Sequence, residues 1–138
     1  MTDRRPGSIL PGMPVPPNSH LMMPADPVAE LTRANAAGLV ARGLCRSFAA
    51  HGIVSLPEFT LRSARRADLF CLDAKSRITI VEIKSSIEDF RSDQKWPDYL
   101  EYCDRFYFAV PEDFPREILP ADQGLMIADA YGATVVRE

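Results

Sequence analysis

Three charged residues on two neighbouring apolar segments could perform hydrolytic chemistry: Asp68, Glu82 and Lys84. Asp68 lies in the apolar segment 66–70, and the other two lie in the β-branched segment 78–84. Side chains alternate along a strand, so Glu82 and Lys84 point to the same face. Burying such a pair costs free energy unless the charges have partners. An aspartate on the adjacent strand completes a set that can hold a divalent cation and activate a water, which is the chemistry of a nuclease.

The same residue types suit the hydrolysis of phosphodiester bonds. Mg²⁺ prefers one or two carboxylates together with water and phosphate oxygens, and it lowers the pKa of an attacking water. Asp68 and Glu82 can supply the carboxylates, and the backbone carbonyl of Ile83 can add a ligand. Lys84 cannot ligate a metal, but its ammonium can orient the water or stabilise negative charge on the phosphate. We therefore predict a site for Mg²⁺ or Mn²⁺; an ion pair between exposed strand residues is the alternative interpretation.

The elements that position these residues follow from the apolar pattern. A helix is predicted from Val28 to about residue 51, with a proline near its first turn and Gly52 as its C-terminal cap. Strands over about 53–61, 66–72 and 77–84 follow, separated by short polar connections. Connections of that length suit hairpins, so the three strands should pair as an antiparallel meander.

The second half of the chain is predicted to continue the same sheet. Ser86 offers an N-cap for a helix over about 87–103, which Pro97 should kink or restart because proline lacks the N–H that a helix needs. The resulting fold class is α/β, with an antiparallel three-strand meander in one mixed sheet flanked by helices. Three further strands are predicted over 105–110, 124–128 and 133–136.

Length and composition indicate one domain preceded by an arm. The chain has 138 residues, of which 46% are hydrophobic, so one folded domain over 28–138 is the expectation. Residues 1–27 hold seven of the 12 prolines and little periodic pattern, which indicates a disordered, proline-rich arm. A contact with a partner repair protein through this arm is the alternative interpretation.

Cysteine usage and hydropathy indicate a cytoplasmic protein. The three cysteines are odd in number and form no Cys-x-x-Cys motif, which argues against a disulfide framework or a zinc ribbon and for a reducing compartment. No apolar run approaches the roughly 18 residues of a membrane-spanning helix. Arg4 and Arg5 are not followed by the apolar segment of a signal peptide. The expected location is the cytoplasm, in association with the nucleoid.

Basic charge gathers around the proposed site, although the chain has a net charge of −3. Residues 62–95 carry eight Lys/Arg against six Asp/Glu, whereas residues 96–138 carry three against nine. The local excess of positive charge is compatible with a nucleic-acid partner near the site, although it is a weak signal by itself.

Two short motifs make the sequence resemble a known group of nucleases. The run Arg65-Arg66-Ala67-Asp68 followed by Ile80-Val81-Glu82-Ile83-Lys84 resembles the PD-(D/E)XK superfamily, with Asp68 as the acid of the second motif and Glu82-Ile83-Lys84 as the third. The longer stretch 81–111 is similar to the MmcB-type DNA repair proteins of bacteria, and the similarity covers about residues 28–138. The resemblance implies a restriction-endonuclease-like fold and a role in DNA repair with Mg²⁺-dependent endonuclease activity.

One feature departs from that superfamily. Many of its members place an acidic residue on the first helix, facing the site, but the stretch 38–46 has no carboxylate, and Glu30 lies near the helix start. Glu58 on the first strand is the alternative third acid, and a solvated strand residue is the other interpretation. A missing acid would weaken metal binding, which leaves a slow nuclease, a nuclease that needs a partner, or a DNA binder without catalysis.

Basic residues beside the motifs are the candidate DNA contacts. Arg65 and Arg66 lie in or beside the first hairpin turn, where they could contact phosphates. Arg91, Lys95 and Trp96 have spacings that share one helix face, so they could contact phosphates and stack on a base. A solvated turn, and a helix with Trp96 packed on the sheet, are the alternatives.

Three functions remain open from the residues and the resemblance. The first is a metal-dependent DNA endonuclease of DNA repair. The second is a non-catalytic DNA-binding or adaptor module on the same fold, which the missing helix acid favours and the intact set of Asp68, Glu82 and Lys84 disfavours. The third is a structural protein that binds a partner through the proline-rich arm.

Overall fold

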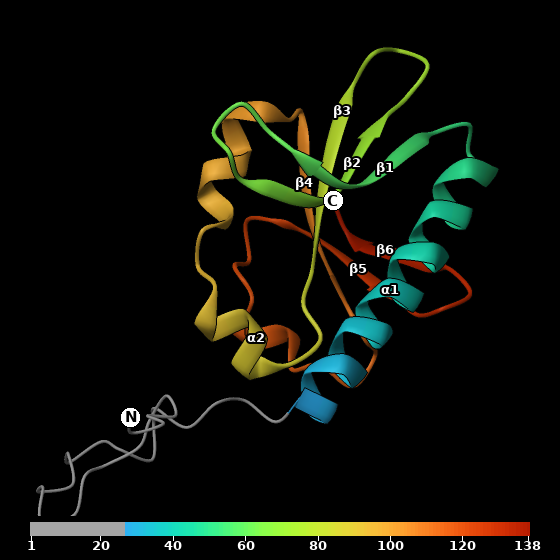
Figure 1. The fold of residues 1–138 in the computed structure, drawn as a ribbon. Helices are drawn as coiled ribbons and strands as arrows, with labels where there is room; N and C mark the ends of the chain where they lie inside the picture. Colours follow the sequence, from blue (N-terminus) through green and yellow to red (C-terminus); the bar gives the residue numbers. More distant parts are fainter. Residues whose placement is uncertain (1–26) are drawn as a thin grey trace, which may run out of the picture. The chain divides into compact units, whose positions relative to one another are not determined.

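The computed structural model describes residues 27–138, so the predicted arm falls almost entirely outside the described part of the chain. The chain divides into two compact units, of which the second runs from Arg33 to Glu138. The site described below lies within this second unit. Figure 1 shows the order of the elements along the chain. The disorder of the arm and its contact with a partner stay predictions.

A long helix, α1, spans Pro27–Ala50, as predicted. It ends in a tight turn in which the N–H of Gly52 donates to the carbonyl of Ala49 at 3.0 Å. Gly52 has a φ of +73°, the left-handed conformation that glycine adopts at a helix end without steric cost. Leu44 and Phe48 near this end are buried, so this part of α1 belongs to the core.

The predicted antiparallel meander is present. Its strands β1 (Val54–Thr60), β2 (Arg66–Leu72) and β3 (Ile78–Ile83) pair in the order of the chain. The two connections turn through Ala64 and Ser76, both of which have a positive φ. Such conformations reverse the chain within a few residues, which is why the polar connections predicted hairpins.

Three more strands complete a six-stranded mixed sheet. β4 (Arg105–Val110) pairs parallel to β3, β5 (Gly124–Ala128) pairs parallel to β4, and β6 (Ala133–Arg137) pairs antiparallel to β5. The strand order across the sheet is β1 to β6, the same as along the chain. Because β3 and β4 run parallel, the segment between them has to return to the starting end of the sheet, and helical structure makes that crossover.

The prediction of a helix over 87–103 is wrong for the residues in the middle of that range, which are not helical. The structure has a short α-helix, α2 (Ile87–Ser92), and then a 3₁₀-helix, η2 (Trp96–Tyr102). Between them the carboxylate of Asp93 accepts a backbone N–H two residues further on at 3.2 Å, a local bond that competes with helix continuation. Pro97 lies in the first turn of η2, where its missing N–H is not needed, so it restarts the helix as predicted.

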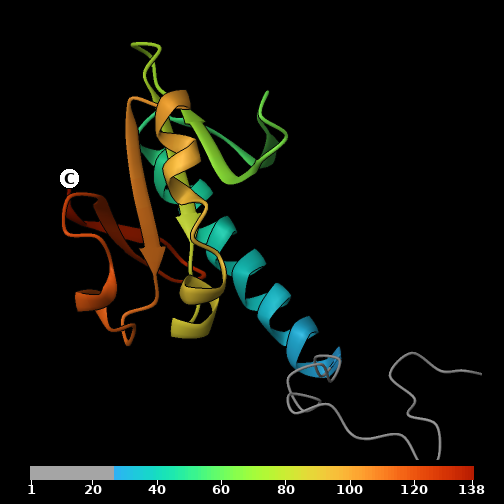
Figure 2. The same cartoon turned by 90° about the vertical axis from the view of Figure 1, so that its left-hand side faces the viewer.

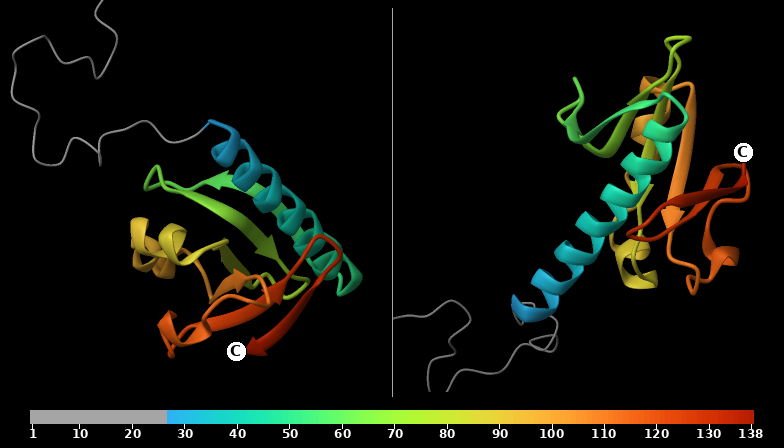
Figure 3. Two further views of the ribbon diagram at one scale, coloured as in Figure 1. Left: turned by 90° about the horizontal axis from the view of Figure 1, so that it is seen from below. Right: turned by 90° about the vertical axis from the view of Figure 1, so that its right-hand side faces the viewer.

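Apolar side chains pack on both faces of the sheet. Figure 2 and the left view of Figure 3 show α1 on one face, with α2 and η2 on the other. A further 3₁₀-helix, η3 (Arg116–Ile118), lies between β4 and β5. The sheet is therefore the middle layer of a mixed α/β fold. The cluster on the α1 side includes Leu44, Phe48, Leu69, Val81 and Met126, and the cluster on the other side includes Phe90, Tyr99, Phe106 and Phe108.

All three cysteines are free thiols, which agrees with the predicted absence of a disulfide framework. Cys71 is buried in the core, whereas Cys45 and Cys103 are half-buried. Burial raises the pKa of Cys71 and of Cys103 to about 11, so both thiols stay protonated at neutral pH. A protonated thiol is a poor nucleophile, so neither of these two is a reactive cysteine.

Candidate active site

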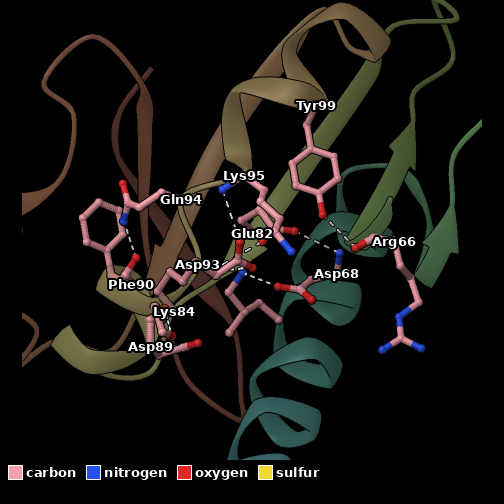
Figure 4. A network of polar contacts seen from close by, with 12 residues as sticks. Arg66, Asp68, Glu82, Lys84, Asp89, Phe90, Asp93, Gln94, Lys95 and Tyr99 are labelled. Carbon is pink, nitrogen blue, oxygen red and sulfur yellow. Dashed lines mark hydrogen bonds and ion pairs between the residues drawn. The ribbon is translucent and has the colours of Figure 1, made fainter. Parts of the chain in front are cut away.

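The site begins where β2 and β3 stop pairing through backbone bonds. The last register pair is Leu69 with Val81, so the next position on β2 is Asp68 and the next on β3 is Glu82. Here carboxylates replace carbonyls as acceptors: the N–H of Asp68 donates to Glu82 Oε1 at 3.3 Å, and the N–H of Ile83 donates to Asp68 Oδ2 at 2.8 Å. Each acid is thereby tied to the neighbouring strand, which places the two side chains side by side (Figure 4).

Lys84 completes the group from the residue after β3. Its N–H donates to the carbonyl of Ala109 on β4 at 3.0 Å, so the backbone is still held by the sheet. Its Nζ lies 3.8 Å from Glu82 Oε2 and 3.5 Å from Asp93 Oδ2. This contact confirms that Glu82 and Lys84 share a face. Lys84 is 3% exposed and Glu82 is 4% exposed, so the alternative of an exposed surface ion pair is wrong.

Burial disfavours the ionised forms of the two carboxyl groups in this site. Burial, together with the neighbouring carboxylate of Asp68, raises the pKa of Glu82 to about 8, although the Lys84 ammonium opposes the rise. Burial also raises the pKa of Asp68, against the opposing effects of the Ile83 N–H and of Lys84. Two neighbouring carboxylates whose ionised forms are disfavoured are stabilised by any additional cation between them. Perturbed acids of this kind are typical of functional sites.

The residues fit a hard divalent cation that keeps part of its own hydration. Among the described residues, no group of three or more His, Cys, Asp and Glu side chains is placed to hold a metal by itself. Asp68 and Glu82 would therefore supply two carboxylates, with water and phosphate oxygens as the other ligands, which is the usual arrangement for Mg²⁺. The hydrogen bonds recorded for Asp68 leave its Oδ1 without a donor from the described residues. The ligand role of the Ile83 carbonyl stays a prediction.

A cavity of about 880 Å³ opens over these side chains. Glu58 lines the same cavity, so the structure brings the alternative third acid to the site. Its neighbours Pro57 and Phe59 pair with Leu69 and Ala67, and Glu58 itself has a φ of +52°. That conformation is uncommon for a residue other than glycine, and such strain often marks functional positions. The catalytic role of Glu58 stays a prediction.

Among the α1 side chains that the structure describes, none that lines the cavity is a carboxylate, in keeping with the sequence of the stretch 38–46. The α1 residues that line it are small or basic, and two of them, Arg42 and Arg46, were given no role in the sequence analysis. Their spacing of four residues was the available signal, because positions i and i+4 lie on the same side of a helix. The α1 lining residues are Ala37, Gly38, Ala41, Arg42, Cys45 and Arg46.

The two arginines of the first hairpin are separated by the structure. Arg66 is exposed and lines the cavity. Arg65 instead forms an ion pair with Asp98 of η2, with Nη2 3.0 Å from Oδ2. Tyr99 of η2 donates its hydroxyl to the carbonyl of Arg66 at 2.9 Å, which fixes the start of β2 against η2. Arg66 is thus the member of the predicted pair that is placed at the site.

The other predicted DNA contacts lie away from the cavity. The ring of Trp96 packs 5.9 Å from that of Phe106 and 5.6 Å from that of Phe108, so the alternative of a tryptophan packed on the sheet is what the structure shows. Arg91 and Lys95 are exposed but are not among the residues that line the cavity. A base-stacking role for Trp96 therefore has no support from the arrangement of its ring.

The segment after β3 is fastened by a predicted cap. Ser86 accepts the N–H of Asp89 at 3.1 Å, and Asp89 Oδ2 accepts the N–H of Ser85 at 3.0 Å. These reciprocal bonds satisfy the start of a helix that is only six residues long. Asp89 and Asp93 both line the cavity, so the α2 side of the site is acidic, whereas the α1 side is basic.

Comparison with known proteins gives the family of the chain. The family model for MmcB-like DNA repair proteins matches residues 24–138. The chain belongs to the MmcB-like family of DNA repair proteins. This membership confirms the predicted resemblance and supports a role in DNA repair. The six-stranded mixed sheet flanked by helices is consistent with the restriction-endonuclease-like fold, and membership of the PD-(D/E)XK superfamily stays a prediction.

A solved structure resembles this MmcB-like protein closely. It is that of a protein of unknown function from Silicibacter pomeroyi, which is 50% identical in sequence and aligns over 71% of this chain and 67% of its own, with a TM-score of 0.68. No curated protein matches the chain significantly. None of the described helices is long and apolar enough to cross a membrane.

Proposed function

We propose that this MmcB-like protein is a metal-dependent endonuclease that hydrolyses DNA phosphodiester bonds during repair. The observation that carries the proposal is the meeting of half-buried Asp68 with buried Glu82 and Lys84 at the floor of a cavity. A surface ion pair would need neither the burial nor the second carboxylate. Family membership supports DNA as the substrate.

In this proposal the acidic residues of the site bind the cation, and its lysine acts on the phosphate. A bound Mg²⁺ or Mn²⁺ would polarise the scissile phosphate and lower the pKa of the attacking water. Asp68 and Glu82 would hold that cation, and their bonds across β2 and β3 fix the positions of the carboxylates before DNA arrives. Lys84 would stabilise the negative charge that develops on the phosphate, because a preorganised ammonium in a buried site acts more strongly than one in water.

The first prediction tests the group directly. Asp68→Asn and Lys84→Gln keep the approximate shapes of the side chains and remove one charge each. We expect each variant to cleave DNA at least about 10²-fold more slowly in Mg²⁺ or Mn²⁺, since one transition-state contact in a buried site contributes that much. The measurement is cleavage of branched, single-stranded and duplex DNA. Glu101→Gln, an exposed acid of η2 outside the cavity, is the control.

Thermal unfolding of each variant shows whether a loss of cleavage comes from misfolding and not from the missing charge. If the wild-type protein cuts none of these DNA forms with any divalent metal, the proposal is wrong. Equal cleavage by the wild-type protein and Lys84→Gln would also contradict it.

One observation favours a second candidate, a DNA-binding module without catalysis. The described side chains of the α1 wall include arginines but no acidic residue of the kind that many nucleases of the superfamily it resembles place there. This candidate predicts salt-dependent DNA binding that survives Glu82→Gln and is weakened by loss of Arg66, with no cleavage in any metal. The cleavage assay above separates the two candidates.

A further inference from the structure

Among the residues that the structure describes, three arginines line the cavity and form no ion pair. Arg42 and Arg46 come from α1, and Arg66 comes from β2. All three side chains are exposed, and none takes part in an ion pair among the side chains that the structure describes. By contrast, Arg65 and Arg77, which are close to the same sheet, are paired with Asp98 and Asp73. The cavity thus gathers guanidinium groups that have hydrogen-bond donors left to use.

The two helix arginines are held on a fixed backbone. Gly43, between them, lies so close to the turn after β5 that an added Cβ would come 2.0 Å from the carbonyl oxygen of Asp129. Ser47 Oγ donates to the carbonyl of Ala133 at 3.3 Å one turn further along. Because α1 is seated against the sheet at these points, Arg42 and Arg46 project from a rigid wall and lie about 5–6 Å apart at their Cβ atoms.

Basic residues on the wall and acidic residues on the floor select a particular kind of ligand. An isolated anion would be repelled by the acidic residues on the floor and on the α2 side of the cavity, whereas a free cation would be repelled by the arginines. A chain of phosphodiesters with an associated divalent cation satisfies both, because its phosphates can bind guanidinium groups while the cation lies against the carboxylates.

The dimensions of the cavity favour one strand over a duplex. A sphere of the same volume, about 880 Å³, is about 12 Å across, which is no wider than the major groove of a single DNA duplex. A whole duplex therefore does not fit inside it and could present only one backbone to its mouth, whereas one unpaired sugar–phosphate strand fits inside. Tyr99 is the one aromatic among the described residues that line the cavity, and it is 6% exposed, with its ring stacked on that of Phe106. With no free aromatic surface for stacking, recognition would use phosphates and not bases.

We infer that Arg42, Arg46 and Arg66 form a phosphate-binding wall for one unpaired DNA strand, which they hold over Asp68 and Glu82. The inference rests on the proposed function for the position of the strand above the carboxylates. The binding itself needs no cleavage, so the two can fail separately.

The experiment measures binding without catalysis. A fluorescein-labelled single-stranded oligonucleotide of mixed sequence is titrated with the full-length protein in EDTA and again in Ca²⁺, at several salt concentrations. We expect Arg42→Ala/Arg46→Ala to raise the Kd about ten- to a hundredfold in both buffers, because each lost guanidinium removes a charge-assisted contact. The slope of log K against log salt should fall by about 1.4, the value for two phosphate contacts on a single strand. Arg66→Ala should weaken binding in the same direction.

Two controls separate local contact from net charge. Lys75→Ala/Arg116→Ala removes the same charge from exposed positions outside the cavity and should leave the Kd within about twofold of the wild-type value. Arg42→Lys/Arg46→Lys should restore most of the binding lost in the alanine variant. A blunt duplex of the same sequence should compete more weakly than the single strand.

The outcomes are distinct. Wild-type protein that does not bind the single strand, an alanine variant that binds as well as the wild type, or a duplex that competes equally would each overturn the inference. Arginine-dependent binding without cleavage in any metal would leave the inference intact and overturn the proposed nuclease activity.

Discussion

At the scale of single residues, Lys84 keeps a charge in a buried position because carboxylates replace water around it. Its Nζ has Glu82 at 3.8 Å and Asp93 at 3.5 Å. Burial raises the pKa of Glu82 to about 8, so near neutral pH that acid is largely protonated. Burial also acts to raise the pKa of Asp93, but the Lys84 ammonium and local hydrogen bonds hold it below its ordinary value. Of these two acids, Asp93 is therefore the one that is ionised beside Lys84 at neutral pH.

Because Asp93 lies beside the buried Lys84 ammonium, we expect Asp93→Asn to destabilise the protein by about 1 kcal/mol. The substitution keeps an acceptor for the Lys95 N–H but takes away the carboxylate charge that lies 3.5 Å from the buried ammonium. The half-exposed position of Asp93 limits the cost. Asp98→Asn, which breaks the more exposed pair with Arg65, should cost less than about 0.5 kcal/mol. Urea unfolding of both variants measures the difference. Equal losses in the free energy of unfolding would show that Asp93 does not stabilise the Lys84 ammonium.

At the scale of elements, α1 uses two glycines in opposite ways. Gly38 has open space around its position, and an added Cβ would meet nothing within 4 Å. Gly43 has no such space, because the carbonyl of Asp129 and the backbone of Ala130 and Gly132 occupy it. Both glycines lower the intrinsic stability of the helix. Only at Gly43 is this loss of helix stability offset, because the missing side chain lets α1 pack closely against the turn between β5 and β6.

The pair of glycines gives a matched test within one helix. Gly38→Ala should stabilise the protein by about 0.5–1 kcal/mol, because alanine is the better helix former. Gly43→Ala should destabilise it by about 1–3 kcal/mol, because the new methyl group would push α1 away from backbone that cannot yield. Chemical unfolding of the two variants side by side is the measurement. A Gly43→Ala variant as stable as the wild type would mean that α1 is not seated as described.

At the scale of the whole folded unit, the site lies where several elements meet. The cavity takes residues from α1, from the meander β1–β3, and from α2 and η2. Each of these elements is held by one of the two hydrophobic clusters on the faces of the sheet. Asp68, Glu82 and Lys84 therefore border the cavity, and the hydrophobic clusters on both faces of the sheet hold the elements that carry them.

A cation that binds this group should stabilise the entire unit. Ligands that bind only the native state raise its stability by mass action, by about 2.7 kcal/mol at 100 times the Kd. For a domain of this size we expect Mn²⁺ to raise the Tm by about 5–10 °C over the value in EDTA. Asp68→Asn should abolish the shift, whereas Glu101→Gln should retain it. An identical rise in the Asp68→Asn variant would place the cation elsewhere.

Local features of this protein were predictable from the sequence. The strands of the meander, the C-terminal cap at Gly52, the N-cap at Ser86 and the shared face of Glu82 and Lys84 were all predicted and are present. Each depends on alternation, turn chemistry or capping among residues within a few positions of one another. The helix over 87–103 was predicted less well, because the chain leaves the helix between α2 and η2, where the Asp93 carboxylate bonds the N–H of Lys95.

The sequence by itself determined which residues could do chemistry and on which strands they lie, because side-chain period and residue type are local properties. The tertiary structure decided what surrounds them. The parallel pairing of β3 with β4, the packing of Trp96 against the sheet and the arrival of Arg42 and Arg46 at the cavity all join residues far apart along the chain. Such contacts depend on how complete elements pack, and no short pattern encodes them.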